Sequence, residues 1–95
     1  MNKTELVQWI AKEAGISLTD ARKAVEAIEK EIATALQRGE EVTISRFGRF
    51  STIHRSARMG RNPKTGGVIE IQPTNVPTFK AARALKVIVD DDGHG

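Results

Sequence analysis

Apolar residues recur at helical spacing at the start of the chain. Leu6, Ile10 and Ala14 are each four positions apart, so they lie on one face of a helix. The preceding Asn2-Lys3-Thr4-Glu5 has the form of an N-cap with an acid three residues later, and Gly15 suits a C-terminal stop. We therefore predict a helix over residues 3–14.

A second apolar stripe predicts a longer helix, from residue 18 to about residue 38. Its positions are Leu18, Ala21, Val25, Ile28, Ile32, Ala35 and Leu36. Ser17-Leu18-Thr19-Asp20 repeats the capping pattern and Gly39 closes the helix. Because the link between the helices is short, we expect them to fold back as a hairpin and to bury the stripe continuously.

From residue 42 the pattern changes to alternation and β-branched residues. Residues 42–45 and 50–55 predict two strands. Between them, Phe47-Gly48-Arg49-Phe50 predicts a tight turn in which Gly48 adopts a conformation that other residues resist. We expect the phenylalanines to be buried, and Trp9 to lie in the core or in an interface.

A turn signal at residues 62–67 separates residues 50–55 from another strand-like run at residues 68–72. Proline fixes φ there, and the paired glycines accept positive φ. This predicts a two-stranded ribbon, roughly residues 53–73, with Pro63 near its tip. Pro73 and Pro77 indicate that the returning strand lies at an edge. Residues 79–89 predict a short closing helix.

The charge of the chain is concentrated in one segment. Residues 1–45 carry six Lys/Arg against eight Asp/Glu, residues 46–65 carry six against none, and residues 66–95 carry three against four. The net charge of +3 therefore arises from residues 46–65. A localised basic patch indicates an anionic polymer as partner, with nucleic acid as the first candidate and an anionic membrane as the second.

Composition narrows the functional classes. The 95 residues make one domain, and the absence of cysteine excludes disulfides and thiolate metal sites. No run is long enough for a signal peptide or membrane span, so we expect a cytoplasmic protein. His54 and His94 have no motif partner, which argues against an enzyme and against a cofactor or metal.

A helix-turn-helix DNA reader is an alternative interpretation of the helical hairpin. The second helix, however, carries three glutamates beside its basic residues, at positions 26, 29 and 31, and this mixed surface does not suit a DNA major groove. We interpret the helices as a scaffold. With only four aromatic residues, the chain is also poorly equipped for base stacking on RNA or single strands.

Specific motifs then resemble the bacterial HU and integration host factor family of DNA-bending proteins. The resemblance rests on the capped helix pair, Phe47-Gly48-Arg49-Phe50, Gly60-Arg61-Asn62-Pro63-Lys64-Thr65-Gly66 and Asn75-Val76-Pro77-Thr78-Phe79. It covers residues 1–89, which we expect to form one domain. Arg46, where the family usually has a small residue, and the acidic residues 90–95, expected to be a disordered tail, depart from the family pattern.

The resemblance implies an α+β fold and an intertwined dimer of identical chains or of paralogues. It implies a helical-hairpin body, a three-stranded antiparallel sheet with an extended β-ribbon arm and a short C-terminal helix. It further implies double-stranded DNA as the partner, bound in the nucleoid without sequence specificity and without a membrane, with Pro63 as the wedge that enters the minor groove. The residues assigned to DNA are Lys3, Arg46, Arg49, Arg55, Arg58, Arg61, Asn62, Pro63, Lys64, Lys80, Arg83 and Lys86.

Two other functions stay open at this point. One is a site-specific subunit like integration host factor, which needs a different partner chain. The other is a surface module that binds polyanions without bending DNA.

Overall fold

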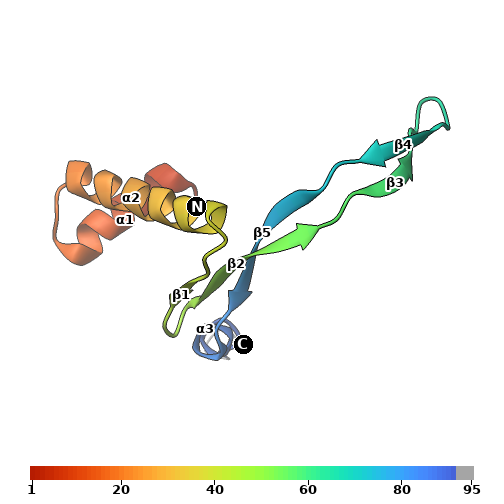
Figure 1. Cartoon of the computed structure of the whole chain (residues 1–95). Coiled ribbons are helices and arrows are strands. Elements are labelled where there is room, and N and C mark those ends of the chain that lie inside the picture. Colours follow the sequence, from red (N-terminus) through yellow and green to blue (C-terminus); the bar gives the residue numbers. More distant parts are fainter. Residues whose placement is uncertain (92–95) are drawn as a thin grey trace.

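The computed structural model describes residues 1–91 of the chain. Its elements are α1 (Lys3–Ala14), α2 (Leu18–Gln37), β1 (Val42–Ile44), β2 (Gly48–Arg55), β3 (Arg58–Arg61), β4 (Val68–Ile71), β5 (Thr74–Ala81) and α3 (Arg83–Val89). The helical hairpin lies at one end and a long ribbon points away from the small sheet (Figure 1). The predicted α+β fold is confirmed.

The two predicted caps fix the ends of the helical hairpin. The Asn2 side chain accepts the backbone N–H of Glu5, and the Ser17 hydroxyl accepts that of Asp20. Gly15 ends α1 with a φ of 68°. The hairpin closes on a small core, which consists of Val7, Ala11, Ala21 and Val25 with Ile10 packed against it.

The prediction of a continuously buried stripe on α2 is wrong within one chain. Ala21, Val25 and Ala35 are buried, but Leu18 and Ile28 remain more than half exposed. Trp9, expected in the core or in an interface, is exposed on α1 within this chain, with the Lys12 ammonium 5.5 Å from its ring centroid. Little of the chain packs over these faces, because the ribbon points away from the hairpin (Figure 1).

The sheet has the strand order β1-β2-β5 and is antiparallel throughout. The turn before β2 differs from the prediction: it spans residues 45–47, and its residue with positive φ is Arg46, at 70°. Gly48 is already the first residue of β2. A Cβ there would lie 2.5 Å from the Phe79 ring, so Gly48 is required for close approach and not for the turn.

The closing helix begins later than predicted. Residues 79–81 continue β5, because Phe79 pairs with Phe50 across the strands and Ala81 pairs with Gly48. Helix α3 begins at Arg83, after Ala82 donates its N–H to the carbonyl of Phe47. Phe79 packs on the rings of Phe47 and Phe50, yet Phe47 and Phe79 remain 44% and 45% exposed.

The ribbon is formed by β2 and β5 near the sheet and by β3 and β4 beyond it. Arg55 pairs with Thr74 and Arg58 with Ile71, so the register is continuous, but the residues between, 56–57 and 72–73, are unpaired. Pro73, in this stretch, has a φ fixed at about −65°, which departs from the φ of a regular antiparallel strand. Pro77 lies within β5, an edge strand, as predicted. The chain is accordingly elongated, with extents of 56 × 36 × 28 Å.

Candidate nucleic-acid interface

The tip of the ribbon is a closed turn held by Asn62. Its backbone N–H donates to the Gly67 carbonyl and its carbonyl accepts the N–H of Gly66, at 2.8 and 2.7 Å. The Asn62 side-chain oxygen accepts the N–H of Lys64 at 2.8 Å. This organisation leaves Pro63 exposed at the end of the ribbon, with a fixed φ and no N–H to satisfy.

Arginines follow the ribbon on both of its faces. Arg58 pairs with Ile71 and Arg61 with Val68, and three positions along a strand place these two arginines on opposite faces. The Arg61 guanidinium also donates to the Gly66 carbonyl at 3.2 Å, which braces the tip. Arg55 stands at the end of β2. Among residues 1–91, none of the three forms an ion pair, so their charges are available to an anion.

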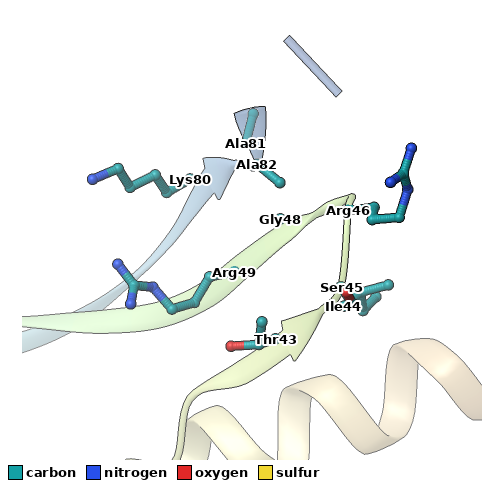
Figure 2. Close-up of a pocket in the computed structure, with 9 residues that line it drawn as sticks. All are labelled: Thr43, Ile44, Ser45, Arg46, Gly48, Arg49, Lys80, Ala81 and Ala82. Atoms are coloured by element: carbon teal, nitrogen blue, oxygen red, sulfur yellow. The ribbon is translucent and has the colours of Figure 1, made fainter. Parts of the chain in front are cut away.

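The base of the ribbon carries a further group of cations. Arg49 and Lys80 are register partners on β2 and β5, and their side chains extend to the same side of the sheet, whereas Arg46 points away from them (Figure 2). The three line a cleft of about 270 Å³ beside the β1–β2 turn. Glu41 lies 3.4 Å from the Arg49 Nε, an ion pair that local sequence pattern does not indicate.

Three assigned residues, Lys3, Arg83 and Lys86, lie on helices outside the sheet surface formed by Arg49 and Lys80. Arg83 and Lys86 are on α3, whereas Lys80 is on β5, so these three cations do not share one helix face. Lys3 lies on the helical hairpin and donates to Glu29 of α2 at 2.7 Å. This hydrogen bond raises the pKa of Lys3, so the ammonium stays charged beyond its ordinary range.

His54 has a structural partner on the neighbouring strand. Its Nδ1 is 2.9 Å from the side-chain oxygen of Asn75, its register partner on β5, so an Nδ1–H donates to that oxygen. Residues 1–91 gather no group of three His, Cys, Asp or Glu side chains suited to a metal. They also contain no helix long and apolar enough to cross a membrane. His94 and residues 92–95 of the predicted tail lie outside the described residues.

Comparison with known proteins decides the family. A family model described as bacterial DNA-binding protein matches residues 1–90. The DNA-binding protein HU of Geobacillus stearothermophilus is 48% identical over 86 residues, which cover 90% of this chain and 96% of the relative. This chain belongs to the HU family. HU-alpha of Vibrio proteolyticus has the same identity and coverage.

Solved HU structures share the fold. An Anabaena HU–DNA cocrystal structure matches with a TM-score of 0.88 and 39% identity, covering 95% of this chain and 98% of that one. HU from Thermotoga maritima matches with a TM-score of 0.67 and 31% identity, covering 95% of this chain and 100% of that one. The resemblance to HU inferred from the ribbon motif is confirmed.

Proposed function

We propose that this chain is an architectural protein that binds double-stranded DNA without sequence specificity and bends it. The observation that carries the proposal is the ribbon, which places unpaired arginines along its length and an exposed proline at its tip. The solved HU–DNA cocrystal with a similar fold supports it. A cytoplasmic, nucleoid-associated location follows from that role.

The ribbon suits the minor groove of DNA. The narrow groove has a strongly negative potential that attracts arginine, which favours Arg55, Arg58 and Arg61. With its side-chain oxygen engaged in the turn, Asn62 has its NH₂ group free to donate to minor-groove acceptors, whose pattern is degenerate. The ribbon therefore recognises the width and the negative potential of the groove, and we expect the protein to show little preference for DNA sequence.

Pro63 acts as the wedge that enters a base step. This arrangement is already known for minor-groove architectural proteins of this family, in which unstacking costs a few kcal/mol and the bent duplex reaches more protein surface. In this chain a rigid ring stands beyond a turn closed by four hydrogen bonds of Asn62, Arg61 and Gly66. These hydrogen bonds and the fixed φ of proline hold the ring in place at the tip.

The functional unit is a dimer, of identical chains or with a paralogue. Within one chain Leu18 and Ile28 of α2, and the Phe47–Phe79 contact, stay about half exposed. An open cleft of about 410 Å³ lies between α2 and the strands β2 and β5, lined by Leu36, Thr52 and Pro77. A second copy covers these surfaces and brings a second ribbon to the same duplex.

A Pro63→Ala variant tests the bending mechanism. The variant keeps every charge, so we expect it to bind a nicked or gapped duplex nearly as well as the unmodified protein does, whereas its binding to intact duplex falls further. Energy transfer between dyes at the two ends of a short duplex measures the bend. We expect lower transfer with the variant; equal transfer shows that Pro63 only stiffens the turn.

A further inference from the structure

Two cations stand directly opposite each other at the base of the ribbon. Arg49 and Lys80 are register partners on neighbouring antiparallel strands, so their side chains share one face of the sheet. Opposed Cβ atoms in such a pair are about 4.5–5.5 Å apart, and like charges there are destabilising. Repulsion between the two cations lowers the stability of the fold unless an anion lies between or above them.

An acidic side chain of the same chain neutralises the pair only in part. Glu41 precedes β1 and reaches the Arg49 Nε at 3.4 Å, with both side chains at least half exposed. Among residues 1–91, Lys80 has no ion-pair partner. The guanidinium has five N–H donors and Glu41 meets only one of them at this distance, so donors remain for a second acceptor.

The same face connects this pair to the ribbon. From Arg49 and Lys80, alternate register pairs lead through Ser51 and Thr78, whose hydroxyls are hydrogen-bonded at 3.0 Å, to Arg55 at the end of β2. An anionic chain that lies along this face therefore passes from one cationic position to the next. Between them it meets the Ser51 and Thr78 hydroxyls and then the apolar Ile53–Val76 pair.

We propose that Arg49 and Lys80 form a phosphate-binding site at the base of the ribbon, which takes one phosphodiester of the DNA backbone. Glu41 is the internal competitor: its carboxylate holds Arg49 in the free protein and is displaced when the phosphate arrives. The inference rests on the proposed function and adds to it a regulated contact outside the tip. Arg46, whose side chain points away in Figure 2, is not part of the pair.

Glu41→Gln and Glu40→Gln form a matched test. Each variant raises the net charge by one and breaks one exposed ion pair, since Glu40 holds Arg38 at 3.2 Å as Glu41 holds Arg49 at 3.4 Å. Affinity for a labelled linear duplex of mixed sequence is measured at several salt concentrations. We expect Glu41→Gln to bind about 1.5- to 5-fold more tightly per chain than Glu40→Gln, the range of exposed ion pairs.

The Arg49→Ala background shows whether Glu41 acts through Arg49. There the difference between the two glutamine variants disappears, and the slope of log affinity against log salt falls in magnitude by about one per chain. Equal binding by Glu41→Gln and Glu40→Gln in the unmodified background overturns the inference while leaving the proposed function intact. If the unmodified protein binds no duplex at all, the proposed function fails first.

Discussion

At the residue scale, the β1–β2 turn assigns the positive φ to a different residue from the one expected. Arg46 adopts the left-handed conformation that sequence reasoning assigned to Gly48, and Gly48 lies flat in β2 under the Phe79 ring. The need for glycine at position 48 comes from the Phe79 ring, which lies 31 positions further along the chain. Local sequence therefore indicates that glycine matters here and does not indicate why.

Gly48→Ala is expected to destabilise the protein by about 1–3 kcal/mol, the usual cost of overpacking. The added Cβ meets two ring carbons of Phe79 at 2.5 Å and the Lys80 carbonyl oxygen at 2.8 Å, and the backbone atom is unable to move aside freely. Urea unfolding at a fixed protein concentration measures the change. Gly67→Ala is the control, because its nearest neighbour is a hydroxyl at 3.3 Å, and a similar loss there contradicts the explanation.

Arg46→Gly is expected to raise stability and weaken DNA binding together. Glycine removes about 1–2 kcal/mol of left-handed strain but gains freedom in the unfolded chain, so the net gain is about 0.5–1 kcal/mol. Arg46→Ala removes the same charge and keeps the strain. We expect the two variants to bind duplex DNA alike and only the glycine variant to melt later; equal melting means that the turn is unstrained.

At the scale of elements, boundaries set by local capping were predictable and one set by strand pairing was not. The side chains of Asn2 and Ser17 mark the starts of α1 and α2 within a single turn of sequence. Helix α3 has no side-chain cap, since Ala82 occupies that position. Its helical pattern extends back to Phe79, but pairing of residues 79–81 with β2 outweighs local propensity.

The ribbon and its tip could be predicted from the sequence. The pair of cations at the base of the ribbon could be recognised only from the strand register. Arg49 and Lys80 are distant in sequence and become neighbours only when β2 and β5 pair. Glu41 reaches Arg49 because β1 pairs with β2. A charge pattern along the chain shows where cations are frequent, whereas their grouping on one face depends on which strands meet.

The unpaired stretch of the ribbon is expected to act as a joint. Pro73→Val frees the φ of residue 73 from about −65°, so this residue can adopt strand geometry and the ladder can continue from Arg55 to Arg58. We expect backbone order parameters of residues 58–71 to rise toward the rigid value of about 0.85. Pro77→Val, within the paired part of β5, is the control and leaves them unchanged. If the two variants have the same order parameters, the flexibility of the ribbon does not arise at residue 73.

At the scale of the whole molecule, the exposed apolar surface predicts an obligate dimer. Ile28 is 55% exposed on α2, and residues 87–89 of α3 are exposed more than this. Ile28→Glu is expected to give monomers or unfolded chains, because a charge there opposes burial against the partner. Met59→Glu changes an apolar residue on the ribbon that is 66% exposed, and we expect this control to leave the mass of the particle unchanged.

Sedimentation at low micromolar concentration measures this mass. We expect two chains per particle for the unmodified protein and for Met59→Glu. A folded monomer of the unmodified chain under these conditions contradicts the dimer, because the apolar faces of α2 and α3 are then stable in water.

The continuous register of the ribbon also constrains how the gene for such a chain can change in length. From Gly48 and Ala81 out to Arg61 and Val68, every pair obeys one alignment, even across the unpaired stretch. Loss of a single codon between Arg55 and Arg58 turns every side chain beyond it to the other face of β3. We therefore expect changes in ribbon length to be tolerated when they are paired in both strands, or when they fall within the tip turn.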